Sequence, residues 1–344
     1  MLRIRRRETV QNGFGRSFSQ HTINGILSKK SVYFRAKMQY NKIRFRAYHP
    51  SVFSPKPGVK SRFLTKKIEV AALYEIDELL KQVKRIHMIG IGGAGMCPLA
   101  EILLKEGYTL TGSDNNESDN LTKLRSLGVP VSMGHRAENI GNAEMVVYTA
   151  ALLDDNPELC AAKTLGVPTF ERAKLFGAVT RMYSNCIGVC GTHGKTTVTS
   201  MLAQILIMAE LDPSAVIGGR LPLIDSHGRV GHSDTLVCEA CEFADTFLSL
   251  SPDVAVILNI DEDHLDYFKT LGNIIRSFHQ FASMAQTLII NGDDRNTRQA
   301  VADLLAQKEV VTFGLGGGND YSAANLQVHR GAFPEYDLLC RGKM

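Results

Sequence analysis

The sequence lacks the features that place a protein in a membrane or outside the cell. Its 344 residues contain no apolar run of 18 residues and no secretory hydrophobic region, so we expect neither a membrane span nor export. The seven cysteines are odd in number and scattered, which is typical of reduced thiols in a reducing compartment. These absences predict a cytoplasmic protein without a membrane partner.

The cysteines also lack the spacing of a zinc site. Cys238 and Cys241 form a C-x-x-C pair, but no second pair stands at zinc spacing. Alternation along the strand predicted over residues 235–241 directs one of the two thiols inward. We therefore expect no metal at this pair.

Acidic residues are scarce in only one part of the chain. Residues 1–70 hold 17 Lys and Arg against two acids, whereas residues 71–344 hold 22 Lys and Arg against 33 acids. The formal net charge of +4 therefore combines a basic leader with an acidic body. Because the body is acidic, the charge does not indicate a nucleic-acid partner.

Three interpretations of the leader stay open. Its composition, rich in Arg, Ser and aromatic residues, is that of an organelle transit peptide, and also that of an arm that binds polyanions. It equally fits upstream sequence translated from too early a start, with Met38 or a later codon as the real beginning. With few patterned apolar residues, residues 1–70 are expected to be disordered or to follow a mis-annotated start.

A glycine-rich loop, Gly188-Val-Cys-Gly-Thr-His-Gly-Lys-Thr-Thr197, is the most informative feature. An apolar run from Ile187 to Val189 predicts a strand before it, and Lys195-Thr196 opens a predicted helix. In such a unit, backbone N–H groups and the helix N-terminus bind phosphate, the lysine contacts the outer phosphates, and the threonine hydroxyl binds Mg²⁺. The spacing is two residues shorter than the Walker A pattern, but its setting predicts a triphosphate site.

The helix after this loop shows an apolar period of 3.6 residues, which predicts one buried face. The residues of that predicted face are Val198, Met201, Leu202, Ile205, Leu206 and Ala209.

A second glycine loop, Gly90-Ile-Gly-Gly-Ala-Gly-Met96, lies upstream. A predicted strand over Arg85–Ile89 precedes it, and a helix through Glu106 and a strand ending at Ser113-Asp114 follow. Taken alone, this G-x-G-x-x-G unit is a dinucleotide fingerprint with Asp114 on the ribose, although UDP-sugars carry a diphosphate as well. A dehydrogenase has no use for a triphosphate loop in the next domain, so we do not expect NAD.

Carboxylates follow two further predicted strands. Leu236–Cys241 ends at Glu242, and the apolar run Val254–Leu258 delivers an acidic segment that contains His264. Functional groups gather at the carboxyl ends of parallel strands, and Mg²⁺–ATP needs oxygen ligands beyond the loop threonine. We therefore expect Glu242 and His264 at the phosphate site, and Asn291, after the strand Thr287–Ile290, on the same face.

Six motifs occur in one order, and together they resemble the Mur ligase family over roughly residues 83–344. The motifs are Gly90-Ile-Gly-Gly-Ala-Gly-Met96, Gly112-Ser-Asp114, Asp155-Asn-Pro-Glu158, Gly191-Thr-His-Gly-Lys-Thr-Thr197, Glu239-Ala-Cys-Glu242 and Asn259-Ile-Asp-Glu-Asp-His264. The shortened phosphate loop is itself a family trait, shared with folylpolyglutamate synthases.

The resemblance implies an α/β fold. A Rossmann-like domain, expected at 71–182, would bind the UDP-sugar, and a P-loop-type central ATPase domain with a mainly parallel sheet is expected at 183–344. The family's C-terminal ligase domain opens with a Gly-x-His-Asn segment that this sequence does not contain. We expect the chain to stop inside the last hairpin of the central domain, as a fragment with impaired activity.

The activity implied by the resemblance is ATP-dependent ligation of L-alanine to UDP-N-acetylmuramate, a step in peptidoglycan precursor synthesis. ATP would phosphorylate the lactyl carboxylate, and the alanine amine would attack the acyl phosphate. Lys195 would neutralise the β- and γ-phosphates, Thr196 and Glu242 would hold one Mg²⁺, and His264 would lie by a second metal. These assignments make Lys195, Glu242 and His264 the catalytic residues.

The resemblance also implies two sets of binding residues. The ATP-binding set is Gly191, Thr192, His193, Gly194, Lys195, Thr196, Thr197 and Asn291. The UDP-sugar set is Gly90, Gly92, Gly93, Ala94, Gly95, Met96, Ser113, Asp114 and His135. Arg172 is a further candidate for the UDP-sugar pocket, although it and His135 also fit a helix start and a turn.

Two other functions stay open. The chain also fits the recycling ligase that joins a preformed tripeptide to UDP-N-acetylmuramate, because the motifs of the first two domains are shared. It fits equally a non-catalytic fragment that binds ATP and the UDP-sugar.

Overall fold

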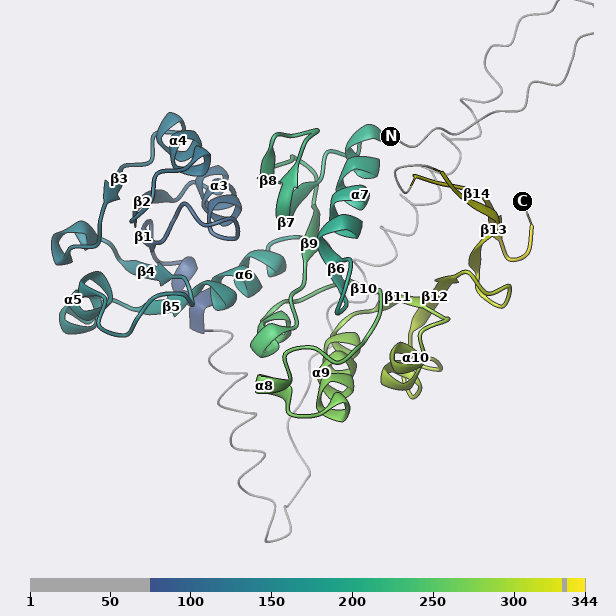
Figure 1. Cartoon of the computed structure of the whole chain (residues 1–344). Helices are drawn as coiled ribbons and strands as arrows, with labels where there is room; N and C mark the ends of the chain where they lie inside the picture. The colour runs from purple at the N-terminus through teal and green to yellow at the C-terminus, as the bar shows by residue number, and fades with distance from the viewer. Residues whose placement is uncertain (1–74, 330–332, 344) are drawn as a thin grey trace, which may run out of the picture. The chain divides into compact units, whose positions relative to one another are not determined.

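The computed structural model describes residues 75–329 and 333–343 (Figure 1). The prediction for residues 1–70 falls outside the described residues, as do the first four residues of the predicted Rossmann-like domain. No helix in the described part of the chain has both the length and the apolar character that crossing a membrane requires.

The first sheet has five parallel strands in the order β3-β2-β1-β4-β5. Its strands are β1 (Arg85–Ile89), β2 (Thr109–Asp114), β3 (Val131–Met133), β4 (Met145–Tyr148) and β5 (Thr169–Glu171). Its helices are α3 (Cys97–Lys105), α4 (Asp119–Ser126), the 3₁₀ helix η1 (Ala137–Ile140), α5 (Pro157–Leu165) and α6 (Arg172–Arg181). The order reverses between β1 and β4, which is the switch point where a doubly wound sheet binds its ligand.

Local sequence signals account for these elements. Strand β1 is buried along four of its five residues, as expected for a central parallel strand. Helix α4 begins after Ser118, whose hydroxyl accepts from Leu121 N, and α5 begins with Asn156 as cap and Pro157 in its first turn. Gly166 ends α5 with a positive φ of 70°. The predicted strand–loop–helix–strand unit from Arg85 to Asp114 is confirmed.

The second sheet has nine strands in the order β14-β13-β12-β11-β10-β6-β9-β7-β8. Its strands are β6 (Asn185–Cys190), β7 (Ser214–Leu221), β8 (Ser226–Arg229), β9 (Thr235–Glu239), β10 (Val254–Ile257), β11 (Thr287–Asn291), β12 (Glu309–Gly314), β13 (Tyr321–His329) and β14 (Phe333–Cys340). Only the outer pairs β7–β8 and β13–β14 are antiparallel. The predicted mainly parallel sheet is therefore confirmed.

The helices of this second region are short except for two. They are α7 (Lys195–Met208), the 3₁₀ helix η2 (Phe243–Ser249), α8 (Leu265–Phe268), α9 (Leu271–Met284) and α10 (Arg295–Val301). Strand β6 lies between β9 and β10 in the sheet. The segments after these three strands therefore meet at one edge, where the phosphate loop begins.

The predicted buried face of α7 is right only in part: Val198 and Leu202 are partly buried against a core cluster. The buried residues of this helix are Thr199 and Ala203, whereas Met201 is 46% exposed and Ile205 is 59% exposed. Small side chains let α7 pack closely on β7 and β9. Apolar residues occur around most of the helix, so their period alone does not identify the side that is buried.

One thiol of the C-x-x-C pair points inward, as predicted, although the strand ends at Glu239 rather than at residue 241. Cys238 is fully buried on β9, and its Sγ lies 3.9 Å from Sγ of Cys186 on β6. Cys241 lies beyond the end of β9 and is partly exposed. Both cysteines are free thiols.

Candidate functional site

The loop between β6 and α7 requires glycine at two positions. Gly191 has φ of 147° and Gly194 has φ of 86°, both in the region that favours glycine. A Cβ on Gly191 would lie 2.9 Å from Cβ of Leu258, so a side chain has no room there. The first N–H groups of α7 have no intrahelical acceptor, and with the helix dipole they form an anion site at the residues predicted to bind phosphate.

Asn259, which follows β10, fixes the shape of this loop. Its side-chain oxygen accepts from His193 N at 2.8 Å, and its side-chain nitrogen donates to His193 O at 3.0 Å. Its carbonyl accepts from Thr192 N at 3.0 Å. The sequence motif over residues 259–264 contains this residue but does not by itself indicate its role. Its place directly after a strand neighbouring the loop was the available signal.

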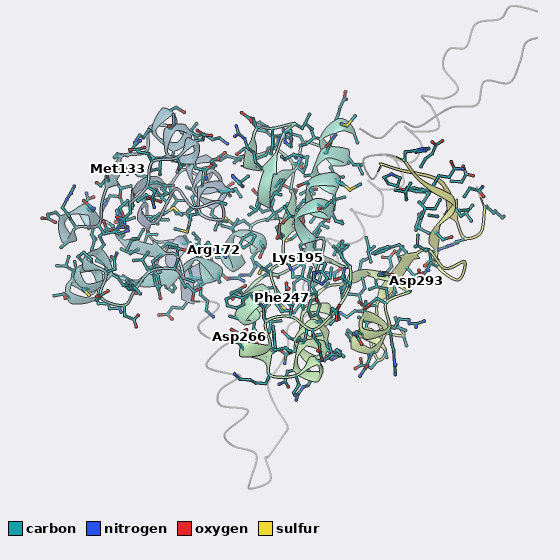
Figure 2. All side chains as sticks on the ribbon, viewed as in Figure 1. Met133, Arg172, Lys195, Phe247, Asp266 and Asp293 are labelled. Atoms are coloured by element: carbon teal, nitrogen blue, oxygen red, sulfur yellow. The ribbon has the colours of Figure 1, made fainter. Side chains whose placement is uncertain are left out.

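Lys195 opens α7 and turns back onto the loop (Figure 2). Its ammonium donates to Gly191 O at 2.7 Å, to Thr192 O at 3.1 Å and to Glu242 Oε1 at 2.9 Å. Only 14% of the side chain is exposed. Lys195 therefore forms a largely buried ion pair with Glu242.

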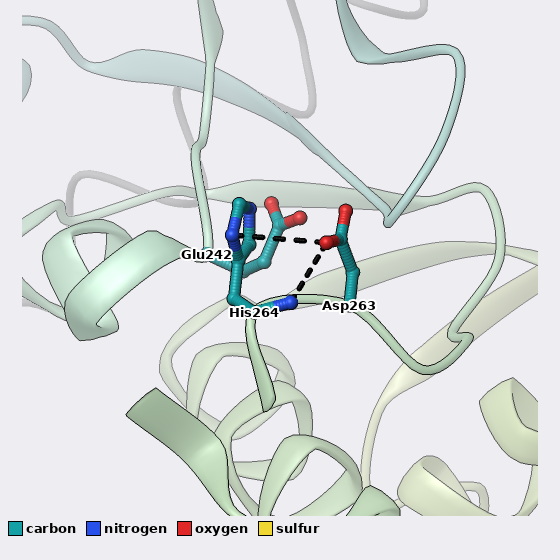
Figure 3. A group of neighbouring side chains, drawn as sticks. All are labelled: Glu242, Asp263 and His264. Atoms are coloured by element: carbon teal, nitrogen blue, oxygen red, sulfur yellow. Dashed lines mark hydrogen bonds and ion pairs between the residues drawn. The ribbon is translucent and has the colours of Figure 1, made fainter. Parts of the chain in front are cut away.

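Glu242 gathers with Asp263 and His264 (Figure 3). One ligand atom from each residue lies within 4.8 Å of the others. Glu242 is 2% exposed, and its Oε2 is buried without a hydrogen-bond donor. The structure thus brings the predicted pair Glu242 and His264 together and adds Asp263. The other acids of this segment, Asp261, Glu262 and Asp266, are exposed.

Backbone strain accompanies this group. His264 has φ of 51°, and Ala244 and Asp245 have φ of 50° and 58°. Non-glycine residues in this region are costly and concentrate at functional sites. The His264 ring also packs edge-on against Phe243, with ring centroids 4.8 Å apart, which limits its movement.

Thr196 contacts a different acid from the one the sequence suggested. Its Oγ1 lies 2.8 Å and 3.0 Å from the two carboxylate oxygens of Glu239, the last residue of β9. Glu239 also accepts from Gly218 N at 2.9 Å. Sequence reasoning paired Thr196 with Glu242 and left Glu239 without a role. In the sheet, Glu239 is in register with Val189, just before the loop.

The donor chemistry of the two groups fits divalent cations. Thr196 and Glu239 offer only oxygen, which Mg²⁺ prefers, whereas Glu242, Asp263 and His264 add an imidazole that suits a broader range of metals. The buried Oε2 of Glu242, which has no hydrogen-bond donor, is the atom that a cation would satisfy.

Asn291 ends β11 on the same sheet edge, one strand beyond β10. Its side-chain oxygen accepts from Asp293 N at 3.0 Å. Asp294 ties this segment to the site, because its carboxylate accepts from Ile260 N at 3.3 Å and caps α10. The position agrees with the expected face, and ATP binding by Asn291 stays a prediction.

The first glycine loop is fastened to the end of β2. Gly90 N and Ile91 N donate to Ser113 O at 2.8 Å and 3.1 Å, and Gly92 N donates to the Asp114 carboxylate at 2.9 Å. Asp114 therefore supports the loop from behind. Helix α3 begins without a side-chain cap; its first N–H, that of Cys97, donates to Gly93 O at 3.0 Å, and Pro98 has no N–H.

A cavity of about 310 Å³ lies between the first glycine loop and the ends of β7 and β9. Gly93, Gly95 and Arg172 line one side, and Gly218 and Glu239 line the other. Arg172 opens α6 (Figure 2) and supplies a cation beside the first loop. The cavity therefore runs from the predicted diphosphate loop to the carboxylate that contacts Thr196.

Two predicted UDP-sugar residues instead meet a buried carboxylate. Ser113 Oγ donates to Glu158 Oε2 at 2.6 Å, and His135 Nδ1 lies 3.4 Å from the same oxygen. Burial raises the pKa of the Glu158 carboxyl, but the His87 ring and hydrogen bonds from Ser113 and Asn139 outweigh it and bring the pKa down to about 2. Ser113 is fully buried, so its side chain supports the pocket from within.

The fold and the site define a nucleotide-binding α/β protein, in which a Rossmann-like sheet precedes a sheet with a phosphate loop. The chain belongs to the Mur ligase family. The family's catalytic-domain profile matches residues 85–184, and the profile of the Mur ligase middle domain matches residues 189–335.

Individual relatives agree. The UDP-N-acetylmuramate–L-alanine ligase of Caldanaerobacter subterraneus subsp. tengcongensis is 43% identical over 272 residues, which are 78% of this chain and 58% of the relative. The enzyme of the same name from Alkaliphilus metalliredigens is 41% identical over 273 residues, with the same coverage. The chain thus spans less than two thirds of the length of these curated relatives.

Solved structures resemble the fold as well. The UDP-N-acetylmuramate–alanine ligase of Thermotoga maritima is 28% identical with a TM-score of 0.66, covering 75% of this chain and 58% of that one. The UDP-N-acetylmuramate:L-alanyl-gamma-D-glutamyl-meso-diaminopimelate ligase of Neisseria meningitides also reaches 28% and 0.66, covering 76% of this chain and 85% of that one.

Proposed function

We propose that this chain binds ATP and UDP-N-acetylmuramate, and that it contributes these sites to ATP-dependent ligation of L-alanine in peptidoglycan precursor synthesis. The curated relatives that carry this name are 40–43% identical to the chain, which supports the choice of substrates. The division into a UDP-sugar domain at 71–182 and an ATP domain at 183–344 is part of the proposal, as is the cytoplasmic location.

The cavity that extends from the first glycine loop to Glu239 is the observation that carries this proposal. A UDP-sugar with its diphosphate at Gly93–Met96 and Arg172 would extend toward Gly218 and Glu239. Glu239 contacts Thr196 at the start of the phosphate-loop helix. A carboxylate on the sugar would therefore lie close to the outer phosphate of a nucleotide, and phosphoryl transfer depends chiefly on such positioning.

The residues of the site suit activation of a carboxylate. A carboxylate is a poor electrophile, and a phosphoryl group gives it a leaving group that an amine can displace. Lys195 would contact the outer phosphates, while Thr196 with Glu239, and Glu242 with Asp263 and His264, would hold the divalent cations. Mg²⁺ at these positions would neutralise charge on the phosphate oxygens. The amine of L-alanine would then attack the acyl phosphate.

Ligation of a preformed peptide is the second candidate. The Neisseria meningitides ligase matches this chain with the same identity and TM-score as the Thermotoga maritima enzyme, and the chain covers more of it. A non-catalytic role in binding ATP and the UDP-sugar is the third outcome of the test below.

The test compares this chain with two chimeras, one that adds the C-terminal part of the Thermotoga maritima ligase and one that adds that of the Neisseria meningitides ligase. Each protein receives UDP-N-acetylmuramate, Mg²⁺–ATP and either L-alanine or the tripeptide, and products are measured by mass spectrometry. We expect the first chimera to form the alanine product faster than the second forms the tripeptide product. The reverse order would support the second candidate. Binding of both nucleotides without any product would leave the chain a binding protein.

A further inference from the structure

The ammonium of Lys195 has no donor left for a phosphate in this structure. A lysine ammonium carries three N–H donors. Those of Lys195 go to Gly191 O, Thr192 O and Glu242 Oε1, at 2.7 Å, 3.1 Å and 2.9 Å. Two of these acceptors belong to the phosphate loop itself. Any nucleotide that uses Lys195 must therefore first break one of these contacts.

Of the three acceptors, Glu242 interacts most strongly with Lys195, because it alone is charged. Its carboxylate is 2% exposed, and a buried charge is costly unless it is paired. Among the described residues, Lys195 is its one recorded ion-pair partner. The second oxygen, Oε2, has no hydrogen-bond donor, although it also lies 2.9 Å from the Lys195 nitrogen. Glu242 cannot release Lys195 without another cation in its place.

A cation that would take the place of the Lys195 ammonium can bind beside the Lys195–Glu242 ion pair. Asp263 and His264 each place a ligand atom within 4.8 Å of the Glu242 carboxylate (Figure 3). A divalent cation held by these three residues would compensate the charge of Glu242 more fully than one ammonium does. Lys195 would then be free to turn toward the outer phosphates.

We propose that Glu242 couples metal binding to nucleotide binding: without metal it retains Lys195, and a divalent cation displaces the ammonium and releases it to the nucleotide. This inference rests on the proposed function, since it takes the second glycine loop as the nucleotide site. Metal and nucleotide then bind with positive cooperativity that depends on Lys195 and Glu242 together.

Simple repulsion between Glu242 and the phosphates makes a different prediction. Repulsion would weaken metal-free nucleotide binding whether or not Lys195 is present. Coupling requires that Lys195 contribute little to metal-free binding while Glu242 is charged, and much once Glu242 is neutral. A double-mutant cycle separates the two explanations.

The experiment measures binding of the non-hydrolysable analogue AMP-PNP to the full chain by calorimetry, in EDTA and in excess Mg²⁺. The variants are Glu242→Gln, Lys195→Gln and the double variant. Glu210→Gln, an exposed acid at the far end of α7, is the matched control. Melting curves check folding, and Lys195→Met replaces Lys195→Gln if the latter does not fold.

In EDTA we expect Glu242→Gln to bind AMP-PNP about tenfold more tightly than the natural chain, which is the factor for one charged hydrogen bond of modest strength. Lys195→Gln should change metal-free affinity little in the natural chain and should remove the gain in the Glu242→Gln background. In Mg²⁺ the single Lys195→Gln change should cost about tenfold or more. The Glu210→Gln control should match the natural chain.

The proposal is overturned if Glu242→Gln gives no gain in EDTA, or if Lys195→Gln costs the same in both backgrounds. Either result leaves the proposed function standing, provided that the natural chain binds Mg²⁺–AMP-PNP. Failure of the natural chain to bind the analogue under any condition would instead remove the nucleotide site, and with it the proposed function.

Discussion

Each glycine loop of this protein lies beside a buried glutamate, and the two glutamates are held in opposite ways. Glu158, near the first loop, accepts hydrogen bonds from Ser113 and Asn139 and lies 3.5 Å from the buried His87 ring nitrogen. Glu242, near the second, pairs with the charge of Lys195. The first carboxylate is held mainly by hydrogen bonds, whereas the second is held by an ion pair and lies beside Asp263 and His264, with which it could hold a cation.

The two strand–loop–helix units are similar, and the residues around them distinguish a site that binds phosphate from one that could also transfer it. Both loops join a buried parallel strand to a helix N-terminus, which is sufficient to bind a phosphate. Only the second adds a lysine and several carboxylates at the ends of neighbouring strands. The proposed function therefore gives the first loop a role in holding the substrate and the second a role in phosphoryl transfer.

Replacement of Lys195 should have the largest effect of the changes considered, on both ATP affinity and stability. Lys195→Ala should weaken Mg²⁺–ATP binding by about tenfold or more and also destabilise the fold by about 2–4 kcal/mol, because it leaves Glu242 buried without its partner. Calorimetric titration and urea unfolding measure the two effects. Adding Glu242→Gln should restore most of the stability and none of the binding. Unchanged ATP affinity in Lys195→Ala would remove the phosphate-loop assignment.

Lowering the pH should reduce the contribution of Glu158 to the stability of the fold. The folded pKa of Glu158 is depressed to about 2, so its stabilising contribution is present above the ordinary carboxyl pKa and is lost as the pH falls toward 2. We expect Glu158→Gln to cost about 3 kcal/mol at neutral pH and progressively less as the pH is lowered through this window.

Urea unfolding at several pH values measures this effect, with the exposed Glu138→Gln as control. A cost that is independent of pH would show that the charge of Glu158 does not contribute to stability.

The two loop glycines should differ in their tolerance of a side chain. A Cβ at Gly191 would meet Cβ of Leu258 at 2.9 Å and the backbone of Asn259 at 3.3 Å. At Gly90 it would meet only the Thr149 side chain, at 2.8 Å. Gly191→Ala should therefore cost about 2–3 kcal/mol and Gly90→Ala about 1–2 kcal/mol, both at positive φ. Thermal unfolding measures the loss of stability in the two variants. A larger loss in Gly90→Ala than in Gly191→Ala would contradict this account.

The smallest predicted effect concerns Arg172. Its removal should weaken UDP-N-acetylmuramate binding about tenfold, the loss expected for one charged hydrogen bond, and leave ATP binding unchanged. Lys163→Ala, an exposed change on α5, is the control. Equal losses of both ligands in Arg172→Ala would point to damage of the fold rather than of the pocket.

Site residues that follow strands could be predicted, because apolar strand segments and glycine-rich loops can be recognised in the sequence. The strand Arg85–Ile89, both glycine loops and the meeting of Glu242 with His264 could all be derived from the sequence. The buried face of α7 could not, since its apolar residues surround the helix and tertiary packing selected Thr199 and Ala203.

The sequence also does not reveal which side chain each of the acids Glu239 and Glu242 contacts. Glu239 and Glu242 are three residues apart after one strand, and only the path of the backbone beyond β9 turns one toward Thr196 and the other toward Lys195. The burial of Lys195 was not predictable either, because a lysine in a glycine-rich turn is usually exposed to solvent. Its burial depends on the same backbone path, which brings Glu242 to it.

Titration calorimetry of the full chain tests the central claim most directly. The account predicts that Mg²⁺–AMP-PNP and UDP-N-acetylmuramate each bind at one site and can be bound together, whereas NAD⁺ gives no binding heat. Tight binding of NAD⁺ without binding of the ATP analogue would contradict it, because the first loop would then be a dinucleotide site and the second loop would not hold a triphosphate.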